Sequence, residues 1–248
     1  MNNRAALITG ASLGIGAETA RELASIGFNI GINYRSSEAE AHKVKQQVEQ
    51  MGRKAILLKA DVSQEIEVKN MVNQFISEFR RIDVLVNNAG VMIKRCPVEL
   101  MDLDLYNRVM DVNVKSCFLC SREVIPYMKK QKWGRIINLS SISAFNGGGV
   151  GAAIYAASKG AIVTFTKALS KEVAEYGIRV NAVAPGTIDT PFHSVTSPKD
   201  MEDRKNSHPL KRHGRADEIS AVVGFLVSER ADYISGATID VNGGEYLR

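Results

Sequence analysis

The 248-residue sequence contains little cysteine, and this scarcity excludes two classes of cross-linked protein. Three cysteines are too few for a disulfide framework. Cys117 and Cys120 form a C-x-x-C pair, but no second cysteine pair or histidine cluster stands nearby to complete a zinc site. We therefore expect no metal, and we interpret the pair as two small apolar side chains that face a helix-packing surface.

Long apolar runs are also missing, because none reaches membrane-spanning length without a charge. The first ten residues lack the cationic start and the long apolar core of a signal peptide. The sequence therefore predicts a cytoplasmic protein with no membrane partner. Its net charge of +5 comes from 32 basic residues interspersed with 27 acidic ones, so a nucleic-acid partner is not expected either.

Apolar runs and amphipathic stretches alternate along the whole chain, and hydrophobic residues make up 45% of it. Near-continuously apolar strands separated by helices indicate a parallel sheet covered on both faces. We therefore predict an α/β fold in a single domain, residues 1–248, with a Rossmann-type, doubly wound, seven-stranded parallel sheet. The expected strands are 5–9, 28–33, 54–60, 83–89, 134–140, 178–185 and 237–243, and the expected helices are 14–26, 38–51, 64–80, 103–130, 152–176 and 216–228.

One long irregular stretch, 187–215, follows the sixth predicted strand and contains Pro191, Pro198 and Pro209. Its charges are dense and its large apolar residues are few, so without a ligand it cannot bury enough surface to offset the entropy of ordering. We predict that it is a mobile substrate lid.

A glycine-rich turn, TGASLGIG at 9–16, joins the first predicted strand to a helix. Glycines let the backbone approach a pyrophosphate closely, and a helix N-terminus offers free amides to its charge. The G-x-x-x-G-x-G spacing differs from the usual G-x-G-x-x-G, and a tight turn without a ligand is the alternative. A P-loop is excluded because Gly-Lys-Ser/Thr is missing. The predicted contacts are Gly10, Ser12, Leu13, Gly14, Ile15 and Gly16.

The second predicted strand runs into Tyr34, Arg35 and Ser36, where many NAD enzymes place an acid that binds the ribose 2′-hydroxyl. An arginine at this place favours a 2′-phosphate, and therefore NADP, although a solvated loop residue would look the same. Five further contacts are expected where the third and fourth strands end, since ligands bind at the carboxyl edge of such sheets: Asp61, Val62, Asn87, Ala89 and Gly90.

Tyr155 and Lys159 are one helical turn apart in the stretch IYAASKGAI, so their side chains project from one face of the helix. Taken alone, the pair is either catalytic chemistry or an accident of composition. The neighbouring ammonium would favour the phenolate and so lower the cost of proton transfer near neutral pH.

Five ordered motifs make the chain resemble the short-chain dehydrogenase/reductase family. They are TG-x-x-x-G-x-G at 9–16, NNAG at 87–90, the asparagine of DVNVKS at 113, a serine pair ahead of Y-x-x-x-K at 155–159, and PG at 185–186. The resemblance extends to the closing DVNGG at 240–244. The sequence is most similar to the branch that contains 3-oxoacyl-acyl-carrier-protein reductases and related sugar and polyol dehydrogenases.

This resemblance implies an NADPH-dependent reductase in which Tyr155 protonates a carbonyl oxygen. Lys159 would then tune that acid and hold the nicotinamide ribose, while Ser141 would bond the substrate oxygen and Asn113 would position a water molecule that links Lys159 to solvent. One extra residue in the glycine-rich loop before Tyr155 leaves Ser143 as the alternative to Ser141. The segment expected beside the nicotinamide is Pro185, Gly186, Thr187 and Ile188.

The resemblance leaves the substrate open between a ketone on an acyl carrier protein and a free sugar, uronate or polyol. Lysines at two helix ends favour a carrier protein, whereas polar lid residues favour a polyhydroxylated substrate. A non-catalytic NADP(H)-binding regulator is the alternative from another class, although such a protein need not keep the four proton-transfer residues. The lysines are Lys129, Lys130, Lys132 and Lys171, and the lid residues are His193, Ser194 and Thr196.

The predicted helices 103–130 and 152–176 carry apolar and small residues on more than one face, which is more than contact with the sheet requires. We therefore expect them to pair with symmetry mates in an isologous interface. The family commonly builds a second interface from its last strand and tail, so the resemblance implies a homotetramer.

Overall fold

The computed structural model describes residues 3–248, apart from the side chains of Ser194 and Val195. Seven strands form one sheet in the order β3-β2-β1-β4-β5-β6-β7, and every neighbouring pair is parallel. The chain order reverses between β1 and β4, which creates the crevice where such sheets bind ligands. The strands are Ala5–Ile8, Asn29–Tyr34, Ala55–Lys59, Val84–Asn87, Gly134–Leu139, Ile178–Pro185 and Thr238–Val241.

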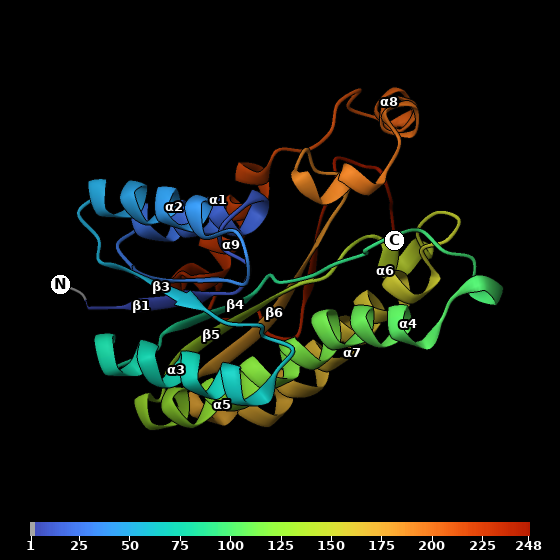
Figure 1. The fold of residues 1–248 in the computed structure, drawn as a ribbon. Helices are drawn as coiled ribbons and strands as arrows, with labels where there is room; N and C mark the ends of the chain where they lie inside the picture. Colours follow the sequence, from blue (N-terminus) through green and yellow to red (C-terminus); the bar gives the residue numbers. More distant parts are fainter. Residues whose placement is uncertain (1–2) are drawn as a thin grey trace.

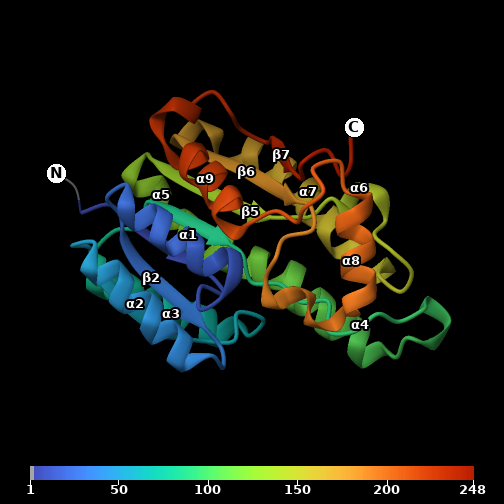
Figure 2. The same ribbon diagram turned by 90° about the horizontal axis from the view of Figure 1, so that it is seen from above.

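Three helices cover each face of the sheet (Figures 1 and 2). One layer holds α1 (Gly14–Ser25), α2 (Glu38–Gln50) and α9 (Ala216–Val227). The opposite layer holds α3 (Glu65–Phe79), α5 (Ser116–Gln131) and α7 (Ala153–Val173). The predicted single-domain, Rossmann-type, doubly wound fold is confirmed.

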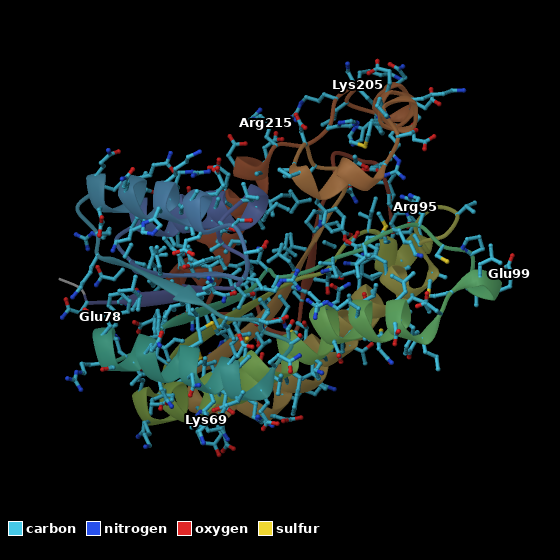
Figure 3. The ribbon with its side chains drawn as sticks, in the orientation of Figure 1. Lys69, Glu78, Arg95, Glu99, Lys205 and Arg215 are labelled. Carbon is cyan, nitrogen blue, oxygen red and sulfur yellow. The ribbon has the colours of Figure 1, made fainter. Side chains whose placement is uncertain are left out.

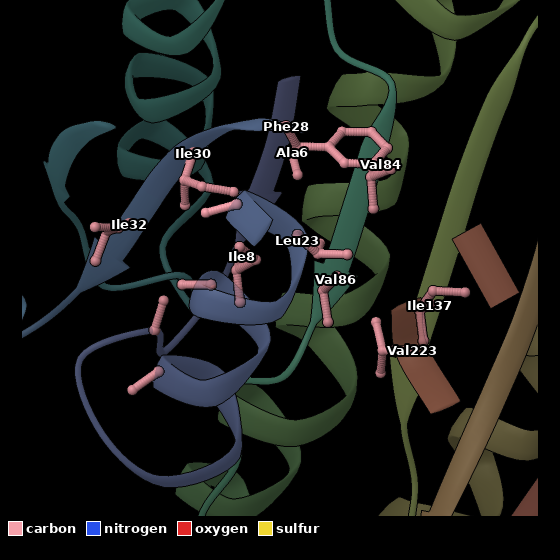
Figure 4. Close-up of a cluster of buried hydrophobic side chains, with 14 of the residues drawn as sticks. Ala6, Ile8, Leu23, Phe28, Ile30, Ile32, Val84, Val86, Ile137 and Val223 are labelled. Atoms are coloured by element: carbon pink, nitrogen blue, oxygen red, sulfur yellow. The ribbon is translucent and has the colours of Figure 1, made fainter. Parts of the chain in front are cut away.

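Successive β1 residues feed two separate cores because side chains alternate across a strand. Ala6 and Ile8 pack with Leu23 and Val223 on the α1 and α9 face (Figure 4), whereas Leu7 packs on the opposite face. All four β1 residues are completely buried, which explains why the strand appears in the sequence as an unbroken apolar run.

The region predicted as one helix, 103–130, is divided in the structure. It consists of α4 (Leu103–Met110), a π-helical turn at Asp111–Lys115, and α5. Single π-turns inside helices are frequent at functional sites. Here the turn contains Asn113, whose amide group meets the backbone of Val91 beyond β4.

The predicted irregular stretch, 187–215, is in fact partly helical, which corrects the sequence-based expectation. It contains a 3₁₀ turn at Pro191–Val195 and α8 (Pro198–Ser207). Local signals explain α8, because the Ser197 side chain accepts a hydrogen bond from the Asp200 amide and Pro198 occupies the first turn. No residue of α8 is buried, so little packing holds the helix to the domain.

The remaining elements are short and lie between the main helices and strands. They are the 3₁₀ turns Val98–Leu100, Ala174–Tyr176 and Glu229–Ala231, and the single-turn helix α6 (Ser143–Asn146).

Candidate active site

A cavity of about 520 Å³ lies at the edge of the sheet where the strands end. Its walls are the loops that follow β1, β4, β5 and β6, together with the first turn of α7 and the segment 190–193. The cavity therefore occupies the crevice predicted from the strand order. Predicted site residues in its lining are Gly10, Leu13, Gly14, Ile15, Ala89, Gly90, Ser141, Tyr155, Lys159, Pro185, Gly186, Thr187 and Ile188.

The glycine-rich turn admits no side chain at its tightest point. A Cβ added at Gly16 would clash with the Gly10 carbonyl oxygen and lie 2.5 Å from the Asn88 Nδ2 atom. Gly14 has a φ of +53°, a conformation that L-residues with side chains rarely adopt. The glycine spacing is therefore required by the geometry of this turn.

Three polar residues that the sequence analysis missed hold the turn in place. Asn33 Oδ1 accepts a hydrogen bond from the Gly10 amide at 3.1 Å, and Asn88 Nδ2 donates to the carbonyl oxygens of Thr9 and Gly10 at 2.9 and 3.0 Å. Thr9 Oγ1 accepts from the amides of Asn88 and Ala89, each at 3.0 Å. Thr9 and Asn88 belong to the TG and NNAG motifs, whereas no motif marked Asn33, which is in β2.

The first turn of α1 fits a bound pyrophosphate. No side chain caps this helix N-terminus, and its first turn contains no acidic residue. Its positive dipole end therefore meets the cavity at Gly14 and Ile15 without a competing carboxylate. Ser12 and Gly16 belong to the same turn but do not line the cavity.

Arg35 and Ser36 are exposed just beyond β2. Arg35 has a partly buried acidic partner, Asp61. Its Nη1 atom lies 3.6 Å from the carboxylate of Asp61, which also pairs with Arg108 at 3.2 Å. The Ser63 hydroxyl donates to the same carboxylate at 2.6 Å. Because Arg108 and Ser63 already compensate Asp61, the Arg35 guanidinium can turn to another anion.

Three predicted contacts have their side chains in the interior rather than at the cavity. Tyr34 and Val62 belong to the two cores, so only their backbone atoms remain available. Asn87 donates to Ser121 Oγ at 3.1 Å and to Asn138 Oδ1 at 2.9 Å, beneath α5. The sequence could not distinguish these directions, since alternate residues at a strand end face opposite sides.

Tyr155 and Lys159 both line the cavity from the first two turns of α7. Burial raises the pKa of the Tyr155 phenol to about 12, although its hydrogen bond with the Ser141 side chain opposes this shift. Burial lowers the pKa of the Lys159 ammonium to about 8. Burial therefore dominates the pKa of the phenol, and the expectation that Lys159 favours the phenolate stays a prediction. Lys159 Nζ lies 5.8 Å from the phenol ring centroid and donates to the Leu139 carbonyl oxygen at 2.7 Å.

Asn113 lies next to the Lys159 ammonium without lining the cavity. A Cβ added at Gly90 would lie 3.2 Å from Lys159 Nζ and 3.4 Å from Asn113 Oδ1, so these two atoms flank the same small residue. Asn113 Nδ2 donates to the Val91 carbonyl oxygen and to Ser158 Oγ, both at 2.9 Å. The π-turn therefore anchors the loop after β4 against α7.

Ser141 and Ser143 both line the cavity, and the Ser141 side chain forms a hydrogen bond with the Tyr155 phenol. Ser141 Oγ accepts a hydrogen bond from the Ser143 amide at 3.1 Å. A hydroxyl has two acceptor lone pairs and one hydrogen, so Ser141 can accept this bond and still donate its hydrogen to Tyr155 or to a substrate oxygen.

The segment 186–188 is braced by Glu245, a residue of the C-terminal tail that the sequence analysis missed. Its Oε2 accepts from the Thr187 amide at 2.7 Å, and its Oε1 accepts from the Thr187 hydroxyl at 2.8 Å. Phe192 covers the cavity from the lid, with its ring centroid 5.7 Å from that of Tyr155. The segment predicted as a lid therefore contacts the Tyr155 ring.

The lysines considered for carrier-protein docking lie at the opposite edge of the sheet. Lys129 and Lys130 are in the last turn of α5, and Lys132 lies between the end of α5 and the first residue of β5, Gly134. Lys171 is in the last turn of α7, ahead of the start of β6. Helices that connect parallel strands return to the edge where the strands begin, whereas the cavity lies where they end.

The C-x-x-C pair is structural, as the sequence analysis proposed. Cys117 and Cys120 are buried, unbonded to each other, and packed on the sheet from α5. Burial raises the pKa of the Cys117 thiol to about 12, so it stays protonated and unreactive at neutral pH.

No helix in residues 3–248 is long and apolar enough to cross a membrane.

Comparison with known proteins agrees with this geometry. A protein-family profile described as "Enoyl-(Acyl carrier protein) reductase" matches residues 10–245. The chain is 39% identical over 245 residues to a 3-oxoacyl-[acyl-carrier-protein] reductase of Staphylococcus epidermidis, covering 99% of this chain and 100% of the relative.

Two solved structures share the fold over nearly the whole chain. A short-chain dehydrogenase of Burkholderia cenocepacia in complex with NADP has a TM-score of 0.92 at 31% identity, covering 98% of both chains. An NADH-dependent reductase responsible for alginate metabolism has a TM-score of 0.90 at 34% identity, covering 99% of this chain and 98% of that one. The chain therefore belongs to the short-chain dehydrogenase/reductase family of oxidoreductases.

Proposed function

We propose that this protein is an NADPH-dependent reductase that converts a ketone to a secondary alcohol. The observation that carries the proposal is the meeting of Tyr155, Ser141 and Lys159 in one cavity that begins at an uncapped, glycine-lined helix N-terminus. The NADP complex of one structural neighbour and the 3-oxoacyl reductase names of several relatives support it.

The cofactor would lie along the loops after β1, β4 and β6. The Gly10–Gly16 turn would hold its pyrophosphate, Arg35 and Ser36 its 2′-phosphate, and Asp61 and Val62 its adenine edge. Ala89 and Gly90 would form the floor of the crevice, and Pro185–Ile188 would face the nicotinamide end. Bound NADPH supplies the hydride that reduces the carbonyl carbon.

The residues of the chain then handle the proton. Tyr155, kept protonated by its raised pKa, gives its phenol proton to the oxygen that develops negative charge. The Ser141 hydroxyl donates a hydrogen bond to that same oxygen. The Lys159 ammonium stabilises the phenolate left behind and bonds the nicotinamide ribose, while Asn113 keeps the neighbouring loop in place.

Assay of NADPH oxidation over a panel of ketones tests the proposal. The panel contains acetoacetyl thioesters, keto-sugars and diketones, which separates a 3-oxoacyl reductase from a sugar or polyol enzyme. We expect turnover of at least one class. Stoichiometric NADPH binding without turnover of any ketone would instead favour a non-catalytic NADP(H)-binding regulator.

Ketone reduction should slow as the pH rises through about 8. Both the neutral phenol and the charged ammonium support reduction, and raising the pH removes first the charge of Lys159, whose pKa is about 8. We expect kcat/KM for reduction to fall by up to about tenfold per pH unit above that point. Rates measured from about pH 6 to about pH 10 check this, and a flat profile across that range would contradict the role of Lys159.

The segment 187–215 is proposed to act as a lid that closes over substrate and opens to release product. Because α8 buries none of its residues, we expect its amides to exchange rapidly in the free protein and to gain protection with NADP and a substrate analogue. Hydrogen exchange measures both states. Equally slow exchange in residues 190–212 with and without ligand would rule out a mobile lid.

We propose a homotetramer because large apolar side chains remain exposed on two surfaces of the subunit. Leu103, Tyr106 and Phe118 are exposed on α4 and α5, and Tyr233 and Leu247 are exposed near the β7 edge of the sheet. Two isologous interfaces on these surfaces would give four subunits. Light scattering at micromolar concentration should report a mass near four chains, and a monomeric mass would contradict the proposal. The cytoplasm stays the predicted location.

A further inference from the structure

Two arginines converge on the outer part of the cavity across a glycine. Arg95 comes from the loop after β4, and Arg204 comes from α8 of the lid. A Cβ added at Gly149 would lie 3.2 Å from Arg95 Nη1 and 4.0 Å from Arg204 Nη2, so both guanidiniums face the same gap. Figure 3 places Arg95 between α8 and α6.

Neither guanidinium has an acidic partner within ion-pair distance among residues 3–248. Arg95 Nη1 donates to the Val150 carbonyl oxygen at 3.0 Å. Asp200 acts on Arg95 from beyond ion-pair distance, and Glu245, which acts on His193, is already bonded to Thr187 through both oxygens. Burial and the charge of Arg204 lower the pKa of Arg95, as expected for two cations that lack a counterion.

His193 lies between this pair of arginines and the catalytic phenol. Its ring packs edge-on against Phe192 at 5.4 Å, and Phe192 in turn contacts Tyr155. The His193 Nδ1 atom is buried and has no hydrogen-bond partner among the described atoms. Burial and the charge of Arg204 lower the imidazole pKa to about 4, so the ring is neutral and offers a free hydrogen-bonding nitrogen at neutral pH.

We propose that Arg95 and Arg204 bind an anionic group of the substrate, a carboxylate or a phosphate, so that the enzyme reduces small ketones that carry such a group. A guanidinium presents a planar fork of donors that matches both anions. The rings of His193 and Phe192 lie between the arginines and Tyr155. We therefore expect the anionic group of the substrate to be several bonds from the carbonyl that is reduced. The inference rests on the proposed reductase function and narrows its substrate class.

Matched pairs of ketones test it. We would compare 4-oxopentanoate and 5-oxohexanoate with their methyl esters, and dihydroxyacetone phosphate with dihydroxyacetone, by kcat/KM with NADPH. We expect a preference of roughly tenfold or more for the charged member of at least one pair. The oxo-acid pairs report a carboxylate, and the dihydroxyacetone pair reports a phosphate.

Variants then assign the preference to the arginines. Arg95→Gln and Arg204→Gln should each reduce the preference in kcat/KM for the anionic ketone several-fold, and together should erase it, while kcat/KM for the neutral partner changes less than about threefold. Gly149→Asp should act like the double variant, because it places a carboxylate in the gap and keeps both arginines. Lys205→Gln is the matched control, since Lys205 is on the same helix and pairs with Glu202 at 3.6 Å.

Equal turnover of charged and neutral members in every pair, or equal losses on both in the arginine variants, would overturn the inference. A calorimetric titration of 5-oxohexanoate into the enzyme–NADP complex separates this failure from that of the proposed function. Saturable binding that is lost in the double variant, with no turnover of any ketone, would keep the anion site and reject the reductase.

Discussion

Tyr155→Phe should lower kcat for ketone reduction by roughly two to four orders of magnitude. The substitution removes the phenol hydroxyl, with its transferable proton and its hydrogen bond to Ser141, but keeps the ring and its contact with Phe192. The dissociation constant for NADPH should therefore change by no more than a few-fold. Steady-state kinetics and a fluorescence titration of NADPH measure the two quantities separately.

Tyr246→Phe is the matched control for this prediction. Tyr246 also lies near the site, stacked on Phe145 at 6.5 Å, and the change again removes a single hydroxyl. We expect its turnover to stay close to that of the unmodified enzyme. If Tyr155→Phe were to turn over at a similar rate, Tyr155 would not be the proton donor.

Arg35→Asp should erase or invert a preference for NADPH over NADH of roughly one to three orders of magnitude. In the unmodified protein the exposed guanidinium is free to leave Asp61, which Arg108 and Ser63 also compensate. In the variant, a second carboxylate beside Asp61 would repel the 2′-phosphate and accept a hydrogen bond from the 2′-hydroxyl of NAD.

The ratio of kcat/KM for the two cofactors measures this preference. Lys43→Asp is the control, because it makes the same charge change on an exposed residue of α2 that pairs with Glu40 at 2.8 Å. It should leave the ratio nearly unchanged. Equal kcat/KM for NADPH and NADH in the unmodified protein would show that Arg35 does not select the cofactor, and the NADH-dependent structural neighbour makes this comparison necessary.

Local pattern was sufficient to predict the architecture. All seven strands were predicted to within two residues at each end, because both faces of a parallel sheet are buried and its strands are unbroken apolar runs. The helix after the glycine turn was predicted for a similar reason, since Gly10, Gly14 and Gly16 define a turn that tolerates no side chain. The helix α8 was missed, although Ser197 and Pro198 are ordinary helix-start signals, because the density of charge and proline around them was taken for disorder.

The sequence by itself determined the fold, the order of the motifs and the chemical types present in the cavity, because each of these depends on residues close together in the chain. Only the tertiary structure decided which side chains meet. Glu245 binds Thr187 from 58 positions away, and Arg204 faces Arg95 across Gly149, contacts that leave no local pattern. The same holds for Asn87, which turns into the core while Asn88 turns toward the glycine loop. The direction in which a side chain points at a strand end depends on packing against elements distant in the chain. The burial that raises the pKa of Tyr155 and lowers that of Lys159 depends on the same packing.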